Sequence, residues 1–548
     1  MKKIFSINHT LTFLVALLFI LSASSCSKRK SGDQPLMDST YIVQYMNAEP
    51  RFKDDIYWAK LFYKERAYEL AWFKGHELVP QAQAFIDELG KAGEDGLDPK
   101  DYQLVDFEKL FKDFKGIKRD LEKRDSLELE IDMALTSSYL NWSSDYYRGL
   151  LAPSESRKAD WDINLNKMNL SSALTKFLNE NAEDDIEFRP NHPEYANLRK
   201  ALASFREVQK AGGWPKIPAN ATITDGQSSP VVPLLKARLA TFLGKDSTVM
   251  KDDKPIFSSD VKSALKKFQE TSGLTATGRL NAETIRFMNV PVEDRIRQII
   301  INMERWRWIP ESFGTDYLIV NIPEFKLRVY EQGKEVMNMK VIVGKELHST
   351  PIFNDKMEHI VLAPYWNIPP GILKDEIAPS VRANPGYLAS KDMEVITNDG
   401  TVVDPGSVDW STAGTSGFKY IVRRRPGPNN DLGNVKFIFP NSRNIYLHDT
   451  PADQLFNASK RDFSHGCVRV ERPIDLAVYL LRNVGGWDKS KIMEQIKTGN
   501  EKYVPLKAKL PVYLVYFTAS ADAEGHVRFF DDVYGHDKKL KSMYFSKL

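Results

Sequence analysis

The stretch RDFSHGCVRVERP, residues 461–473, brings a thiol, an imidazole and a guanidinium within five positions of one another. Cys467 is one of only two cysteines in 548 residues, with His465 two positions before it and Arg469 two positions after it. A thiol is a weak nucleophile until a nearby base or positive charge favours its thiolate. The pattern therefore predicts a reactive cysteine. The alternative, an inert cysteine buried as a small hydrophobe, fits these polar neighbours less well.

Two histidines are candidate bases for this thiol. His465 shares the cysteine's own turn, so the spacing alone does not fix its direction. His448 ends a predicted strand 19 positions before Cys467, and a hairpin-like return would bring the two strand ends together. Tyr446 alternates with His448, so both side chains should face the same side of that strand. Gly466 gives the backbone freedom to present amides to a developing oxyanion.

The other cysteine, Cys26, ends an N-terminal export signal. A basic MKK precedes the apolar run 11–23, and the small residues of SASSC follow it. This order is typical of a secretory signal peptide, and the apolar run is too short to be interpreted as a membrane span. The small residues before Cys26 resemble a bacterial lipoprotein signal; an ordinary signal with an incidental cysteine is the alternative. We expect a signal peptide over 1–25 and a polar tether over 26–40, which leaves Cys467 without a disulfide partner.

The composition describes an ordinary globular chain that is too long for one core. Apolar residues make up 42% and charged residues 27%, which predicts two to four packed domains. The formal net charge is only +3, with both signs interspersed. Nucleic-acid binding usually requires a basic face or stripe, so we expect no nucleic-acid partner.

The hydrophobic period changes twice along the chain. Residues 41–212 have a mostly helical pattern, and a helix is predicted over 192–213, beginning near Pro193 and ending at a glycine pair. GGWPKIP (212–218) is rich in helix breakers, and a compact helical unit follows it. From about residue 315 the period becomes two, with three strands separated by a proline-containing turn and a glycine turn, and the chain should end as a hairpin.

The helical unit resembles the peptidoglycan-binding domain type 1. Its first two helices each repeat an apolar face, Gly273 fits a helix C-cap, and Asn281 opens a third helix. The order FQ…SGL, TG.L and ET carries the resemblance. A three-helix bundle without a ligand is the alternative.

The motifs IYLHDTP (445–451) and FSHGCVRV (463–470) together resemble the signature of the YkuD-type L,D-transpeptidases, enzymes of peptidoglycan cross-linking. The signature is highly specific: a His-x-Thr element, then Ser-His-Gly-Cys-x-Arg. Other segments resemble the large subtype of that family, which has a helical scaffold, a peptidoglycan-binding domain and a mobile capping loop. These segments are EDGLDPKDY (94–102), GGWP (212–215), VGK (343–345), TP (350–351), APYWNIPPGI (363–372) and YFT with DDVYG near the end.

The resemblance implies a role for each site residue. The nucleophile falls on Cys467 and the general acid/base on His448, whose ring the main-chain carbonyl of Asp449 would hold. A triad through the Asp449 carboxylate is disfavoured, because neighbouring residues of a strand point in opposite directions. The remaining residues are His465 and Gly466 in the oxyanion region, and Tyr446, Trp366, Ser464 and Arg469 in substrate binding, with a loop-bracing role for Arg469 left open.

The implied reaction is acyl transfer between peptidoglycan stem peptides. Cys467 attacks the carbonyl of the third stem residue, and the terminal D-Ala leaves with a proton from His448. The side-chain amine of a second stem then attacks the thioester and forms a 3→3 cross-link. The resemblance implies no metal and no cofactor, with stem peptides and glycan as partners. We expect a monomer in the bacterial periplasm or cell envelope, anchored to a membrane through lipid on Cys26.

Three other functions stay open. Water as the acceptor would make the enzyme an L,D-carboxypeptidase. Another cell-wall cysteine acyl transferase or peptidase would keep the Cys–His pair but lack the stem-peptide groove. A lipid-anchored peptidoglycan-binding scaffold with an inactive catalytic domain is the non-enzymatic alternative, and the complete motif argues against it.

The expected fold class is α+β, in several domains. We predict a helical scaffold over 41–212, a small three-helix unit over 213–292 and a β-rich catalytic domain over 293–548. Residues 373–430 contain many prolines and glycines and fit the capping loop, with little regular structure expected.

Overall fold

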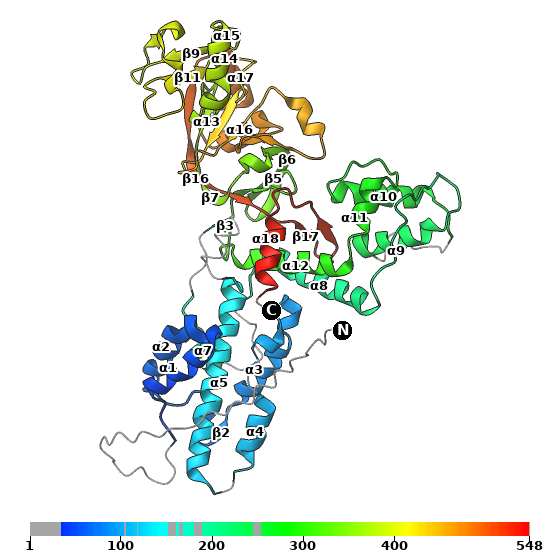
Figure 1. Ribbon diagram of the computed structural model, residues 1–548, viewed down its shortest axis with the longest axis vertical. Coiled ribbons are helices and arrows are strands. Elements are labelled where there is room, and N and C mark those ends of the chain that lie inside the picture. Colours follow the sequence, from blue (N-terminus) through cyan, green and yellow to red (C-terminus); the bar gives the residue numbers. More distant parts are fainter. Residues whose placement is uncertain are drawn as a thin grey trace, which may run out of the picture.

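A computed structural model describes residues 34–102, 106–117, 119–151, 161–163, 168–179, 189–244 and 254–546. The molecule is elongated, with a helical region at one end, a β-rich region toward the other and a small helical unit projecting from the side (Figure 1). The predicted signal peptide and the predicted lipidation site Cys26 lie outside the described residues. In the described part of the chain, no helix combines the length and the apolar character needed to cross a membrane.

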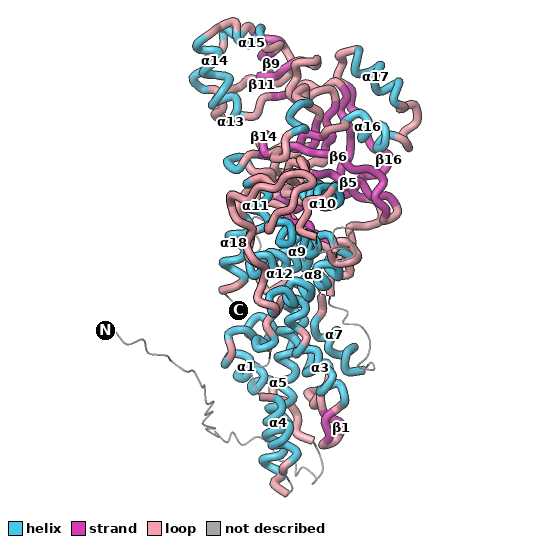
Figure 2. The backbone as a smooth tube through the Cα atoms, turned by 90° about the vertical axis from the view of Figure 1, so that its right-hand side faces the viewer, coloured by secondary structure: helices cyan, strands magenta, loops and turns pink. Residues whose placement is uncertain are grey.

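The helical region is built around one long central helix, α5, which lies among its neighbours in Figure 2. Asp120 caps the start of α5 by accepting a hydrogen bond from the Lys123 amide. Every residue of 131–147 is buried, because helices cover α5 on several sides. The elements are α1 (Ser39–Ala48), α2 (Ile56–Glu65), α3 (Pro80–Gly90), α4 (Phe107–Lys115), α5 (Leu121–Arg148) and α7 (Leu170–Asn179), with a hairpin of β1 (Phe73–Lys74) and β2 (Glu77–Leu78).

Two helices join this region to the rest of the molecule. α8 (Pro193–Lys210) packs on α12 (Val292–Arg307), and the apolar face of α8 belongs to the central core that continues into the sheet. The side unit consists of α9 (Val231–Leu243), α10 (Ser259–Thr271) and α11 (Ala282–Met288). As predicted, the Asn281 side chain caps α11 by accepting from the Thr284 amide, and Gly273 follows α10 with a φ of 71°.

The β-rich region is one large sheet that closes on itself, with one short strand at its end left outside the closure. Its strand order is β12-β13-β15-β6-β5-β4-β16-β7-β3, and β12 also pairs with β7, so the sheet curls into a closed ring. The alternating stretch 317–344 forms three consecutive antiparallel strands, as its period predicts. The strands are β3 (Trp161–Asp162), β4 (Tyr317–Asn321), β5 (Lys326–Glu331), β6 (Lys334–Gly344), β7 (Ile352–Leu362), β12 (Val435–Ile438), β13 (Leu447–His448), β14 (Asp462–Ser464), β15 (Val468–Val470) and β16 (Lys502–Val515).

Two parts of this region differ from the expectation. β3 comes from the range expected to be helical, yet it pairs in parallel with β7, and Trp161 packs edge-on against Trp308. After β16, the expected terminal hairpin is the short pair β17 (Ala519–Ala521) and β18 (Val527–Phe529), and a helix, α18 (His536–Tyr544), follows it. Helices α16 (Pro473–Leu481) and α17 (Lys489–Lys497) follow the cysteine motif.

The segment expected to be an irregular loop is a folded capping lobe, which we define as residues 366–424. It has a four-stranded sheet in the order β10-β9-β11-β8 and its own apolar core, which includes Leu373, Val395 and Trp410. The prolines and glycines separate short elements instead of abolishing them. These are β8 (Trp366–Asn367), α13 (Pro370–Ile372), a π-helix (Leu373–Ile377), α14 (Ala378–Ala383), α15 (Tyr387–Ser390), β9 (Met393–Ile396), β10 (Val402–Val403) and β11 (Ile421–Arg424).

The fold class is therefore α+β with helical and β-rich regions, as predicted. The exact domain boundaries remain a prediction. The buried face of α8, which the sequence assigns to the helical scaffold, packs in the core of the β-rich region.

Candidate active site

Three neighbouring strands bring the predicted catalytic residues onto one face of the sheet. In the β12–β13 pair Lys436 lies opposite His448, and in the β13–β15 pair His448 lies opposite Arg469. Directly opposed residues of paired strands point to the same face. Tyr446 lies two positions before His448, and Cys467 lies two positions before Arg469. The Val468 amide donates to the Tyr446 carbonyl at 3.2 Å. The period of two puts Tyr446 and Cys467 on that same side.

His448 is buried, and its ring is oriented by the main chain. Its Nδ1 lies 2.5 Å from the carbonyl oxygen of Asp449. When Nδ1 donates this hydrogen bond, the neutral ring keeps Nε2 as a proton acceptor. Burial, followed by the positive charges of Arg469 and Lys436, lowers the pKa of His448 to about 3, against the opposing effect of the Asp449 carbonyl. The ring is therefore neutral at physiological pH.

The carboxylate of Asp449 points to a different set of partners. Its Oδ2 accepts from the backbone amide of Asn434 at 2.7 Å and from the Asn434 side chain at 3.1 Å, while Oδ1 accepts from the Thr450 amide at 2.7 Å. Gly433 has a φ of 57°, and a Cβ there would come within 2.3 Å of the Asp449 carboxyl carbon. The main-chain carbonyl of Asp449, not its carboxylate, is thus the group beside the imidazole.

Buried hydroxyl groups stabilise the turn that carries Cys467 by hydrogen bonds to its backbone. Ser464 Oγ donates to the Cys467 carbonyl at 2.5 Å and accepts from the Gly466 amide at 3.1 Å. The buried Thr350 hydroxyl donates to the Gly466 carbonyl at 2.7 Å. Gly466 has a φ of 114°, which favours glycine. These bonds fix the backbone on both sides of the thiol.

Opposing effects act on the thiol of Cys467. Burial raises the pKa of Cys467, while hydrogen bonds with Tyr446 and the charges of Lys436 and Arg469 lower it; burial dominates. The Sγ atom lies 3.8 Å from the Asn444 carbonyl oxygen, which accepts from the thiol. The thiol is therefore mostly protonated at neutral pH, so a reaction at this sulfur requires a base.

The capping lobe touches the cysteine turn and the Tyr446 side chain. Glu376 of the π-helix lies 3.1 Å from Nε2 of His465, measured from its Oε1 atom. Trp366 of β8 hydrogen bonds with the side chain of Tyr446. The His465 ring also lies beside the His348 ring, with centroids 5.1 Å apart. The His465 ring thus contacts the lobe through Glu376. His448 instead lies between Lys436 and Arg469 on the neighbouring strands.

Several segments of the chain match models of known protein families. Residues 315–497 match the YkuD family, described as "L,D-transpeptidase catalytic domain". The chain contains an L,D-transpeptidase catalytic domain of the YkuD family. Residues 58–202 match a "Scaffold domain", and residues 228–288 match a "Putative peptidoglycan binding domain".

One curated relative is the "Putative L,D-transpeptidase" of Haemophilus influenzae, which is 35% identical over 272 residues. The match covers 49% of this chain and 54% of the relative, so the chain spans about half of that protein's length. Two solved structures are an L,D-transpeptidase of Xylanimonas cellulosilytica, at 14% identity with a TM-score of 0.18, and an Enterococcus faecium L,D-transpeptidase, at 11% identity with a TM-score of 0.15. They cover 54% and 58% of this chain, and 99% and 100% of their own chains.

Most residues predicted for the site lie together in this catalytic domain. Cys467, His448, Tyr446 and Arg469 share one face of the sheet, and Trp366 reaches Tyr446 from the lobe. Ser464 is different, because its buried hydroxyl holds the cysteine turn. A direct contact between Ser464 and substrate therefore stays a prediction.

Sequence reasoning missed four residues that shape the site. Thr350 and Asn434 position the backbone of the turn and the Asp449 carboxylate, and Glu376 contacts His465. Lys436 lies opposite His448. Alternation within KFIFP puts Lys436 on one side of a strand, but only the pairing of β12 with β13 shows that His448 is its neighbour.

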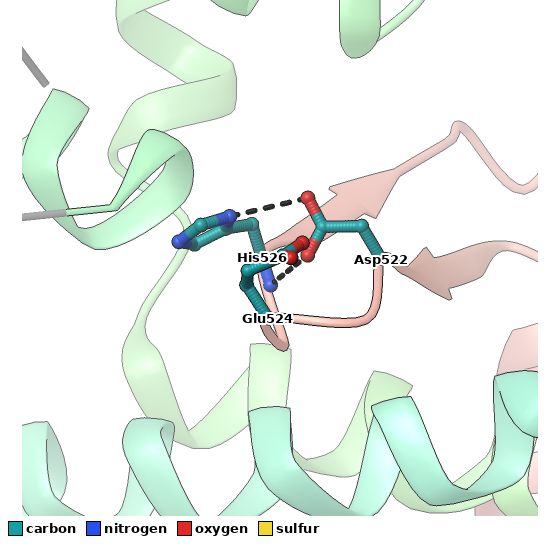
Figure 3. A group of neighbouring side chains, drawn as sticks. All are labelled: Asp522, Glu524 and His526. Carbon is teal, nitrogen blue, oxygen red and sulfur yellow. Dashed lines mark hydrogen bonds and ion pairs between the residues drawn. The ribbon is translucent and has the colours of Figure 1, made fainter. Parts of the chain in front are cut away.

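One group of potential metal ligands occurs in the described residues, away from the row formed by Lys436, His448 and Arg469. Asp522, Glu524 and His526 gather at the turn between β17 and β18 (Figure 3). Asp522 accepts from the His526 amide at 2.9 Å and lies 3.1 Å from Nδ1 of its ring. Lys200 of α8 donates to the Ala523 carbonyl at 2.9 Å. These bonds organise the turn and fasten it to α8.

Proposed function

We propose that the protein is a peptidoglycan L,D-transpeptidase that forms 3→3 cross-links through a thioester on Cys467. In the first step the sulfur attacks the carbonyl of the third stem residue, and His448 takes the thiol proton. The tetrahedral intermediate collapses, its C–N bond breaks, and the D-Ala amine leaves with the proton from His448. In the second step His448 deprotonates the acceptor amine, which displaces the sulfur and forms the new amide.

This proposal is supported mainly by the arrangement of Cys467, His448 and Arg469 on one face of the sheet, inside the matched YkuD domain. Cys467 has no disulfide partner among the described residues, and it lies on the same face of the sheet as a neutral imidazole whose Nδ1 is occupied by a carbonyl. A neutral imidazole is the form that accepts a proton. Because the thiol pKa is raised by burial, proton transfer to His448 is best coupled to attack on the substrate rather than completed beforehand.

The oxyanion is assigned to the turn before and at the cysteine. The Gly466 amide already donates to Ser464 Oγ. Among the described residues, the backbone amides of His465 and Cys467 have no hydrogen-bond acceptor. We therefore propose the Cys467 and His465 amides as donors, with Gly466 providing the backbone conformation.

The location and partners follow from the same proposal. The matched peptidoglycan-binding segment and the catalytic domain both fit a substrate in the bacterial cell envelope. Lipid on Cys26 would keep the enzyme at a membrane facing the cell wall, and we propose a monomer without a cofactor.

Mass spectrometry of purified muropeptides tests the reaction directly. Incubation of tetrapeptide-bearing muropeptides with the protein should give cross-linked dimers whose linkage joins two third residues. The Cys467→Ala variant should give none. Shortened monomers without dimers would identify an L,D-carboxypeptidase instead, and unchanged muropeptides with the wild-type chain would contradict any enzymatic function.

A further inference from the structure

A lysine that the proposed mechanism does not use lies beside both catalytic residues. Lys436 of β12 is directly opposite His448 and diagonal to Tyr446. Its Nζ lies 4.0 Å from the centroid of the Tyr446 ring. Its positive charge lowers the pKa of both the Cys467 thiol and the His448 ring. A ligand that contacts Cys467 would therefore lie within reach of the Lys436 ammonium.

This ammonium has no matching anion in the described residues. Lys436 forms no ion pair there, and the charges that affect it most are Cys467 itself and Glu501. The Glu501 carboxylate accepts a hydrogen bond from the Tyr365 amide at 2.8 Å. Burial lowers the pKa of Lys436. A half-buried cation without a counterion has a desolvation penalty that an anionic ligand can offset.

Arg469, on the other side of His448, strengthens the same argument. Among the described residues its Nε is buried without a hydrogen-bond partner, and it forms no ion pair, although Asp431 acts on it at longer range. The neutral His448 ring thus lies between two cations. An excess of positive charge next to a nucleophile that cleaves peptides is suited to a substrate carboxylate.

We propose that Lys436 binds the terminal carboxylate of the donor stem peptide and is the residue that distinguishes a donor ending one residue after the scissile carbonyl from a longer one. The inference rests on the proposed function. In such a donor the carboxylate belongs to the leaving D-Ala, whose Cα lies about 3.8 Å from the Cα of the attacked residue. The carboxylate therefore falls beside the Cys467–His448 pair, where Lys436 and Tyr446 lie.

Binding of this carboxylate has a second effect on the reaction. The positive charges of Arg469 and Lys436 lower the pKa of His448 in the free protein. A bound carboxylate offsets them and makes His448 a better base when a donor with the correct end is in place. A longer stem would have an uncharged amide at this position, so it would gain neither the ion pair nor the activation.

The test compares two synthetic donors with the full-length protein. One donor is a tetrapeptide stem with a free terminal carboxylate, and the other is the same stem ending in a carboxamide. The rate of D-Ala or D-Ala amide release gives kcat/KM for each. The wild type should prefer the acid by roughly 10–100-fold, the size expected for a charge-assisted hydrogen bond.

Variants at Lys436 assign the preference to this residue. Lys436→Met should bring the acid-to-amide ratio close to one, whatever the change in the absolute rates, and Lys436→Arg should keep most of the preference. Lys356→Met, which removes an exposed lysine of β7, should retain the wild-type ratio. Thermal unfolding of each variant verifies folding, and the ratio of two donors on one protein sample does not depend on the folded fraction.

The outcomes separate this inference from the proposed function. A wild type that releases D-Ala but shows no preference for the acid would overturn the role of Lys436 and leave the transpeptidase proposal intact. A Lys436→Met variant with the full acid preference would assign the carboxylate to another residue, Arg469 first. A wild type inactive on both donors would overturn both. A preference that instead follows amidation of the acceptor stem would place Lys436 in the acceptor site and contradict the proposal.

Discussion

At the residue scale, the site combines a protonated thiol with a neutral imidazole. Burial raises the pKa of Cys467 and lowers that of His448 to about 3. Desolvation thus disfavours a preformed thiolate–imidazolium pair in the free protein. The reactivity of Cys467 should increase when substrate binds, which would protect the thiol from unproductive reactions between turnovers.

Replacement of the nucleophile should separate chemistry from folding. We expect Cys467→Ser to lose cross-linking to below detection, because a hydroxyl is far harder to ionise than a thiol. The side chain is nearly isosteric, so the free energy of unfolding should change by less than about 1 kcal/mol. Muropeptide analysis and thermal unfolding of the same preparation measure the two effects. Substantial residual cross-linking by the serine variant would refute the assignment of the nucleophile.

The two histidines should differ sharply in their importance. His448→Ala should lower turnover by about 10²–10⁴-fold, the usual contribution of a general base, and should also slow alkylation of Cys467 by iodoacetamide at neutral pH. His465→Ala should have a smaller effect, because the His465 ring contacts Glu376 and His348. The measurement is the alkylation rate against pH, with turnover, for both variants. A rise in the apparent thiol pKa with His465→Ala alone would reverse the two roles.

At the scale of the elements, the capping lobe is a folded unit that meets the cysteine turn through few contacts. Its own core is separate from the central core of the sheet. The contact between Glu376 and His465 joins two side chains that are 54% and 40% exposed, so it is worth less than about 1 kcal/mol. Such a contact can break and re-form as a substrate enters and leaves.

Removal of this contact should loosen the π-helix of the lobe. We expect Glu376→Ala to increase amide hydrogen exchange in residues 370–383, with exchange in β9 and β11 unchanged because those strands lie in the lobe core. Asp375→Ala is the matched control, since Asp375 is exposed on the same π-helix. Hydrogen exchange followed by mass spectrometry measures this. Equal effects of the two variants would mean that the Glu376–His465 contact does not hold the lobe.

The sequence predicts elements well where the pattern is local. Strict alternation predicts the strands between 317 and 344, and a proline start with a glycine end predicts α8. The sequence places a capping segment at 373–430, but the regular structure inside it was missed because its strands have two to four residues, too few for a period to be visible. The cysteine motif identifies the catalytic domain, but Lys436 becomes a site residue only through strand pairing between distant segments, which no local pattern reports.

At the scale of the whole molecule, buried charges fasten the helical region to the catalytic domain. Arg307 of α12 pairs with Glu304 at 3.0 Å, donates to the Asp95 carbonyl at 2.6 Å and donates to the Tyr195 hydroxyl at 2.8 Å. Arg305 pairs with Asp537 of α18 at 2.6 Å. Buried groups of this kind define one arrangement, because each displaced partner would leave an uncompensated charge. The position of the catalytic sheet relative to the scaffold is therefore specified by α12.

One buried carboxyl in the helical region should make the stability of the protein depend on pH. Asp145 of α5 accepts a hydrogen bond from the Tyr102 hydroxyl at 2.9 Å, and burial raises its pKa from 3.8 to about 7. Because the folded state holds this proton more tightly than the unfolded state, the stability contribution is fully present below pH 3.8 and is lost as the pH rises through about 7. A shift of this size corresponds to a loss on the order of 4 kcal/mol.

The neutral isostere should remove that part of the pH dependence. Asp145→Asn keeps an acceptor for the Tyr102 hydroxyl but has no proton to lose, so its midpoint of thermal unfolding should exceed that of the wild type at pH 8 and be equal or slightly lower at pH 5. Asp113→Asn changes an exposed residue of α4. Its midpoint relative to the wild type should not rise between pH 5 and pH 8. Calorimetry at the two pH values gives the comparison. If Asp145→Asn lowers the midpoint equally at both, the carboxyl is ionised in the folded protein, and the helical region is held by a buried anion instead of a buried acid.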